Sequence, residues 1–179
     1  MGRTHVLIGM DSVWWVKTLP QGVQPDPGTI LFCFLAAGLG SLLPDLDAQS
    51  SLLQNLTVIG LRPFRLLGVV IAPSGHRGLL HSLTGILLIA GLSAPLAFWS
   101  GDAWVSLILG YCSHLAADAC TRGGIRLRYP NPRRYYLLPR SLRLVTGSAP
   151  EDLVFVLAAC VLLLLLLLVP LTQTTLSPI

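Results

Sequence analysis

Charged residues are scarce in this chain. Of its 179 residues, 11% are charged and 53% are hydrophobic, and the mean hydropathy is +0.71. A soluble globular domain carries about 25% charged residues, so the composition argues against one. The length suits a single domain. We therefore expect residues 1–179 to form one integral membrane domain.

Paired cysteines and a secretory signal are also missing. The four cysteines are scattered through apolar segments without a CxxC pair, and we interpret them as small buried residues that form neither disulfides nor a zinc site. The N-terminus lacks an apolar run followed by a small-residue cleavage site. The main apolar run lies instead at residues 153–171 and includes seven consecutive leucines. As a helix it would be about 28 Å long, enough to cross a bilayer core.

Apolar segments alternate with turns along the chain, and they predict an all-α, polytopic membrane helical bundle of about five transmembrane helices. We expect these helices at residues 5–16, 29–43, 82–99, 103–121 and 152–171. Residues 48–74 mix leucines with arginines and contain Pro63. We therefore expect amphipathic helices on the membrane surface in this segment, not a further crossing.

Basic residues are distributed unevenly over this predicted topology. With the N-terminus inside, 11 of the 12 Lys and Arg residues lie on the cytoplasmic side and only Lys17 lies outside. The segment 122–143 supplies seven of these arginines, with three prolines and three tyrosines. We expect a multi-pass protein of the plasma (inner) membrane, with its N-terminus and a structured basic loop at residues 122–147 in the cytoplasm.

Side chains that bind metals gather at the predicted cytoplasmic ends of the helices. His114 and Asp118 are four residues apart in an apolar segment, so they share one helix face. Ionisable residues inside a membrane segment suggest a functional site. The other candidates at the same depth are His5, Asp45, Asp47, His76 and His81. His and Asp together suit zinc, manganese or iron.

Each motif taken alone also has a simpler explanation. A single interfacial histidine is often a structural hydrogen-bonding residue, and PDxD can end a helix. An HxxxD pair can link two helices, or it can conduct protons or ions. Glu151 follows Ser148 at capping-box spacing. The combination of all these motifs in one chain favours a shared metal site.

Basic groups near these motifs could hold an anion. Arg77 and the backbone N–H groups of the helix start that follows it suit a phosphate or carboxylate. The arginines of residues 122–143 suit phosphates as well. Because anionic lipid headgroups explain a cytoplasmic basic loop, we expect membrane lipids as partners and no nucleic acid. The sequence leaves the oligomeric state open.

Five motifs follow one another from Thr4 to about Glu151: TH, LLPDLD, GHRGLLHS, LGYCSHLAADACT followed by GG, and TGSxxE. They resemble the LexA-regulated, membrane-bound metal-dependent hydrolase family, the YdjM-like proteins. That family is similar in turn to the zinc-dependent phospholipase C and single-strand nuclease superfamily. The resemblance implies metal ligation by Asp45, His76, His81, His114 and Asp118, with His5 and Asp47 as additions. Because the soluble enzymes contain more than four histidines, we expect one or two divalent ions, zinc before manganese or iron.

The function expected from these features is metal-dependent hydrolysis. Metal-activated water would cleave a phosphoester of a lipid or lipid-linked substrate at the cytoplasmic interface. Asp47 or Glu151 would act as general base, and Arg77 would hold the anionic substrate. The alternative is a metal-ion or proton transporter without hydrolytic activity. It needs a polar path across the membrane, whereas residues 82–99 and 103–121 offer only Ser, Thr and Gly beyond the motif end.

Overall fold

Helices dominate the computed structural model, which describes residues 2–17, 27–48, 51–57, 61–65, 68 and 77–174. The longer helices are α1 (Gly2–Lys17), α2 (Pro27–Leu42), α5 (Leu83–Leu92), α6 (Ala94–Trp99), α7 (Gly101–Ala119) and α8 (Ala149–Thr174). The shorter ones are α3 (Leu52–Asn55) and the 3-10 turns η1 (Leu43–Asp47), η3 (Leu79–His81) and η4 (Arg140–Leu142). The predicted all-α class is confirmed.

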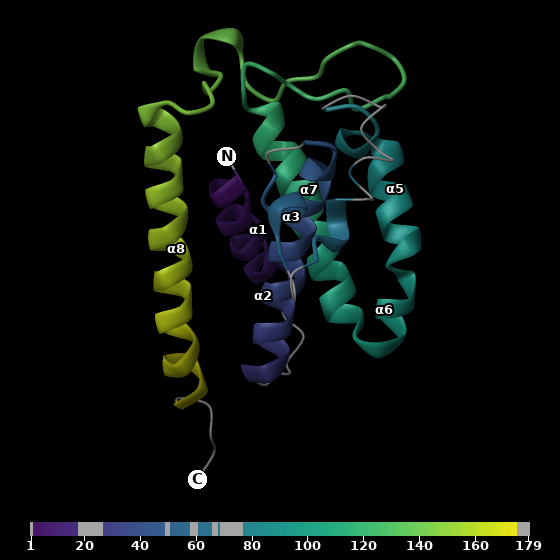
Figure 1. The fold of residues 1–179 in the computed structure, drawn as a ribbon. Helices are drawn as coiled ribbons and strands as arrows, with labels where there is room; N and C mark the ends of the chain where they lie inside the picture. Colours follow the sequence, from purple (N-terminus) through teal and green to yellow (C-terminus); the bar gives the residue numbers. More distant parts are fainter. Residues whose placement is uncertain are drawn as a thin grey trace.

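The helices run alongside one another (Figure 1). Helices α1, α2 and α7 pack together, and α8 packs against α1. The start of α1 and the segment between α7 and α8 lie toward one end of the bundle, and the last turns of α8 lie toward the other. Because α7 ends and α8 begins near the start of α1, residues from distant parts of the sequence meet at this end.

Among the described residues, two helical segments are long and apolar enough to cross a membrane, Gly28–Asp47 and Ala149–Leu167, where we expected about five. The predicted span at 82–99 is divided between α5 and α6, with Pro95 in the first turn of α6. Helix α7 has 19 residues but contains Asp102, His114 and Asp118, and α1 has 16 residues. Polar site residues and a helix break thus reduce the number of candidate spans.

Several helix ends differ from the predicted ones. The helix expected at 29–43 continues into η1, so Asp45 and Asp47 lie in a tight helical turn that follows α2 without a loop. Of the interfacial helices expected at 48–74, α3 is described, and much of the remaining segment lies outside the described residues. The four cysteines are free, as predicted, but the prediction that they are buried holds for Cys33 alone, since Cys112 and Cys120 are half-buried and Cys160 is exposed on α8.

Glycines allow α2 and α7 to approach closely. A Cβ atom at Gly40 would overlap the backbone carbonyl of Leu107, and a Cβ atom at Gly110 would overlap that of Ala37. Small residues at a helix contact let the two backbones come together, as is common in membrane bundles. Buried Ala37 and Ser41 continue the contact along α2. The two helices are therefore held in one register.

We predict that Gly110→Ala destabilises the protein by about 1–3 kcal/mol, because the added methyl group overpacks the α2–α7 contact. Thermal unfolding in detergent measures the effect. Gly91→Ala is the matched control. It also replaces a glycine within a helix, but a Cβ atom at Gly91 meets nothing within 4 Å. Equal melting temperatures for the two variants would contradict the close contact.

Candidate metal site

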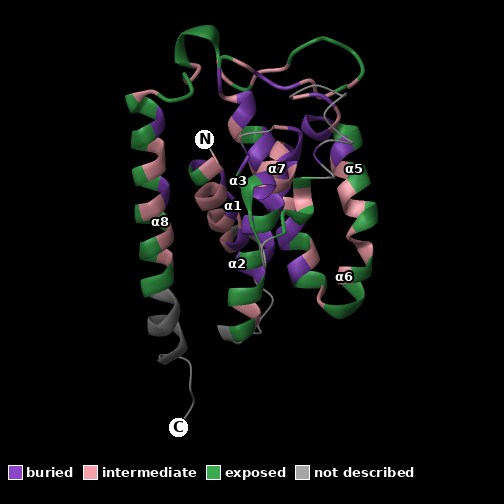
Figure 2. Ribbon diagram, viewed as in Figure 1, coloured by how far each residue is buried: buried purple, intermediate pink, exposed green. Residues whose placement is uncertain are grey.

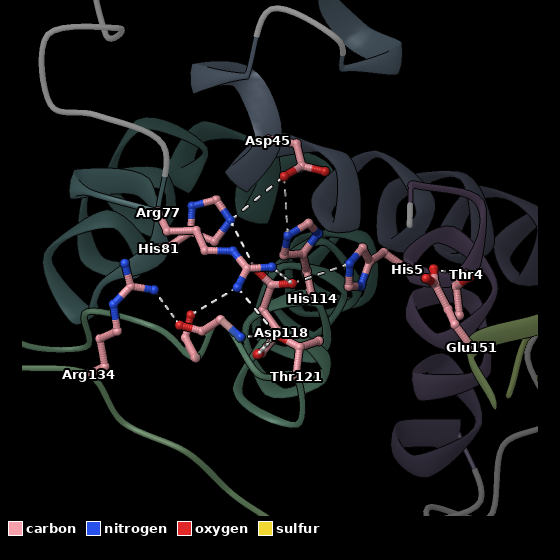
Figure 3. A network of polar contacts seen from close by, with 12 residues as sticks. Thr4, His5, Asp45, Arg77, His81, His114, Asp118, Thr121, Arg134 and Glu151 are labelled. Carbon is pink, nitrogen blue, oxygen red and sulfur yellow. Dashed lines mark hydrogen bonds and ion pairs between the residues drawn. The ribbon is translucent and has the colours of Figure 1, made fainter. Parts of the chain in front are cut away.

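Three histidines and two aspartates converge at the end of the bundle (Figure 3). His5 comes from the first turn of α1, Asp45 from η1, His81 from η3, and His114 and Asp118 from the last turns of α7. All are buried except Asp45, whose side chain is 20% exposed. The structure therefore brings together five of the seven predicted ligands. A sixth, His76, lies outside the described residues.

The contact between α2 and α7 fixes the orientation of His114. Its Nδ1 atom lies 2.6 Å from the carbonyl oxygen of Ser41, which can only accept, so Nδ1 carries the proton. Nε2 then holds the lone pair and lies 3.6 Å from Oδ1 of Asp45. This nitrogen is buried and makes no hydrogen bond to any described residue. A lone pair in this environment suits a metal ion.

The spacing of the donor atoms also fits a metal. Nε2 of His81 lies 3.5 Å from Oδ2 of Asp118 and 3.7 Å from Oδ1 of Asp45. These distances exceed the usual hydrogen-bond range of about 2.7–3.2 Å. Two ligands on a tetrahedral zinc ion, each about 2.0–2.1 Å from it, are about 3.3 Å apart. Asp45, His81 and His114 thus offer two nitrogens and one oxygen at a spacing close to that of zinc ligands, and Asp118 approaches the same nitrogen of His81.

His5 belongs to a second, overlapping group. Its ring stacks on that of His114 at a centroid distance of 3.9 Å, and its Nε2 lies 3.6 Å from Oδ1 of Asp118. Potential ligand atoms of His5, His114 and Asp118 lie within 4.8 Å of one another, as do those of Asp45, His81 and His114. Because His114 offers one lone pair, it can complete only one group at a time. Each group therefore offers three ligand atoms, and Asp118 belongs to the group with His5.

Asp47 lies behind His81. Its Oδ2 is 3.6 Å from Nδ1 of His81 and accepts a hydrogen bond of 3.2 Å from the backbone N–H of Arg77. Asp45 and Asp118 face the other ring nitrogen. The 3.6 Å separation is longer than a hydrogen bond, but the carboxylate lies on the side of the ring from which such a group can orient a ligating histidine. The placement favours an orienting role for Asp47 over direct ligation.

Both terminal nitrogens of the Arg77 guanidinium donate hydrogen bonds within the site. Nη2 donates to Oδ1 of Asp118 at 3.0 Å, and Nη1 donates to Oγ1 of Thr121 at 3.2 Å and to the carbonyl of Gly124 at 3.3 Å. The backbone of Arg77 is left-handed, with φ of 61°. A Cβ atom at Gly123 would overlap the guanidinium, so the absent side chain leaves room for it. Sequence reasoning missed the buried Thr121, although it follows Asp118 by three residues, about one helical turn.

Glu151 lies in the first turn of α8. Its Oε2 accepts a 2.6 Å hydrogen bond from the backbone N–H of Gly147, and its Oε1 accepts a 3.4 Å bond from the hydroxyl of Thr4. This is a capping interaction shifted by one residue, because a capping box would use the N–H of Ser148. Glu151 belongs to neither ligand group.

A cleft of about 600 Å³ opens beside the cluster. His5, Asp45, Arg77 and Asp118 line it, together with Arg3, Thr4, Glu151 and Asp152. Leu42, Leu52 and Phe155 are the bulkier apolar residues of the lining. The cleft therefore combines ligand atoms, charges of both signs and apolar surface.

These features define an all-α protein with candidate membrane spans and a buried His/Asp cluster at one end of its bundle. The chain belongs to the YdjM inner membrane protein family, whose sequence model matches residues 1–176. The expected family and a membrane location are thereby confirmed.

The relatives show how far the similarity extends. The uncharacterized protein YvsG of Bacillus subtilis is 29% identical over 165 residues, covering 89% of this chain and 91% of YvsG. The inner membrane proteins YdjM of Escherichia coli and Shigella flexneri are 34% identical over 116 residues, covering 62% of this chain and 52% of each relative. No solved structure matches the chain. The link to the phospholipase C superfamily stays a prediction.

We predict that His114→Ala and Asp118→Ala each weaken zinc binding by more than about 100-fold, because changes behind the ligands alone cost about 10–100-fold. Elemental analysis and competition with a zinc chelator measure metal content and affinity. Asp102→Asn is the control, since Asp102 is exposed in the first turn of the same helix. Full zinc occupancy in both site variants would exclude this ligand set.

Proposed function

We propose that the protein is a membrane-embedded, metal-dependent hydrolase that cleaves a phosphoester of a lipid or lipid-linked substrate. The observation that carries the proposal is the set of nitrogen and oxygen atoms 3.5–3.7 Å apart beside an open cleft. Asp45, His81 and His114 would hold one zinc ion and leave a coordination position for water, with manganese or iron as alternatives. His5 could join Asp118 at a second ion.

The bound ion would supply Lewis-acid activation of water and of a phosphoryl oxygen. The protein contributes the orientation of the ligands. The Ser41 carbonyl keeps the proton of His114 on Nδ1, Asp47 orients His81, and Arg77 holds one oxygen of Asp118. Of the two carboxylates considered as general base, Glu151 lines the cleft, whereas the side chain of Asp47 is fully buried. Access to substrate therefore favours Glu151 as the base.

Exposed apolar side chains support a multi-pass arrangement in the membrane. Outward-facing leucines cover α2, α5 and α8, and Phe98 and Trp99 of α6 are 92% and 93% exposed (Figure 2). Such a surface suits lipid better than water. We propose that α5 and α6 lie in the membrane beside the candidate spans. The arginines of residues 122–143 favour the cytoplasmic side for the N-terminus and the site.

The cleft favours an amphiphilic substrate with a phosphate group. Its arginines and an ion on the cluster would suit an anion, while Leu52 and Phe155 give it an apolar wall. A cleft at headgroup depth would meet membrane lipids by lateral diffusion. A phospholipid or another lipid-linked phosphate is the substrate class that uses both properties.

We predict that the zinc-loaded protein releases phosphate or headgroup from vesicles of phosphatidylethanolamine, phosphatidylglycerol and phosphatidic acid. Mass spectrometry of the products identifies the bond that is cut. Chelation or Asp118→Ala lowers the rate at least about 100-fold, because metal stabilisation of the transition state is worth several kcal/mol. Asp102→Asn keeps the rate. Zinc uptake into proteoliposomes without any lipid product would favour a transporter instead.

A further inference from the structure

Two arginines line the cleft, and they differ in what they contact. The side chain of Arg77 is 15% exposed, and its guanidinium is bonded to Asp118, Thr121 and Gly124. Arg3 is exposed in the first turn of α1, two residues before His5. Its guanidinium makes no hydrogen bond or ion pair with the described residues. Arg3 is therefore the cleft arginine that can bind a ligand without breaking a contact within the site.

The net charge of the cleft determines whether it attracts or repels an anion. Its lining contains four carboxylates, from Asp45, Asp118, Glu151 and Asp152, against two guanidinium groups. With His5 neutral, the formal charge of these six side chains is two negative, which repels an anion at short range. A divalent ion on the cluster would bring this charge to zero. The bound ion would then be the largest local charge and would attract an anion.

We propose that Arg3 is the anion-binding residue of the cleft, that it holds the phosphate group of the substrate, and that this binding requires the metal. Arg77 is then a positioning residue that sets the carboxylate of Asp118. The inference rests on the proposed function and deepens it. Guanidinium suits this task because its planar fork pairs with two phosphate oxygens.

Calorimetric titration of the full-length protein in neutral detergent tests the proposal, with inorganic phosphate as the probe. We expect the zinc-loaded protein to bind phosphate at least about 10-fold more tightly than the metal-free protein, because the ion cancels the net negative charge and itself attracts the anion. R3Q should weaken phosphate binding by about 10-fold or more, because a charge-assisted contact is lost. Its zinc affinity should stay within about 2-fold of the wild type, because Arg3 contacts no ligand of the ion.

Arg77 is tested separately by its effect on the metal. R77K keeps the charge but loses the forked contact, and it should weaken zinc binding by about 10-fold or more. Short-chain phosphatidic acid provides a second probe. Tighter binding of this lipid than of inorganic phosphate identifies a headgroup ligand, and equal binding identifies a free phosphate. Both results support Arg3 as the residue that binds the phosphate.

R128Q is the matched control, because Arg128 is exposed in the basic loop and does not line the cleft. The proposal is overturned if R3Q binds phosphate like the wild type, if R128Q weakens binding as much as R3Q, or if metal-free protein binds phosphate equally well. The proposed function and the role of Arg3 can be refuted independently. Phosphate binding through Arg3 without lipid cleavage would refute the hydrolase, and cleavage unaffected by R3Q would refute the role of Arg3.

Discussion

The close contact between α2 and α7 is the constraint on which the site depends. Without side chains at Gly40 and Gly110, each backbone reaches the other helix. The same approach places the Ser41 carbonyl 2.6 Å from His114, a residue 73 positions away in the sequence. That contact sets the ring tautomer and turns the lone pair toward η1. The helix packing therefore determines the chemistry that His114 can perform.

Each of the three best-placed ligands is held from behind by a different group. A backbone carbonyl holds His114, the carboxylate of Asp47 faces His81, and the guanidinium of Arg77 binds Asp118. Arg77 has a left-handed backbone in this position, a conformation that costs a residue other than glycine about 1–3 kcal/mol. Its hydrogen bonds to three other groups offset that strain. A ligand set fixed in this way loses little conformational entropy when an ion binds.

The sequence predicts the parts of this site that depend on local spacing. The pair on α7 follows from helical periodicity, and PDLD follows α2 as expected. The supporting groups follow no such pattern. A backbone carbonyl carries no side-chain signature, and the position of Arg77 depends on an absent side chain at Gly123, 46 positions further along. The predicted number of about five spans was wrong for two reasons. Hydrophobicity alone does not show the break between α5 and α6, nor how far the polar site residues lower the hydropathy of α7.

The cluster also joins parts of the chain that lie far apart in the sequence. His5, Asp45, His81 and Asp118 come from α1, η1, η3 and α7, so an ion shared among such residues would connect segments across more than one hundred positions of sequence. Buried carboxylates and imidazoles are costly in an apolar bundle unless something compensates them. A bound ion would do so, and its binding energy would then add to the stability of the folded state. Metal binding and folding would be coupled by this placement, since the residues that would form the site also connect the helices at that end of the bundle.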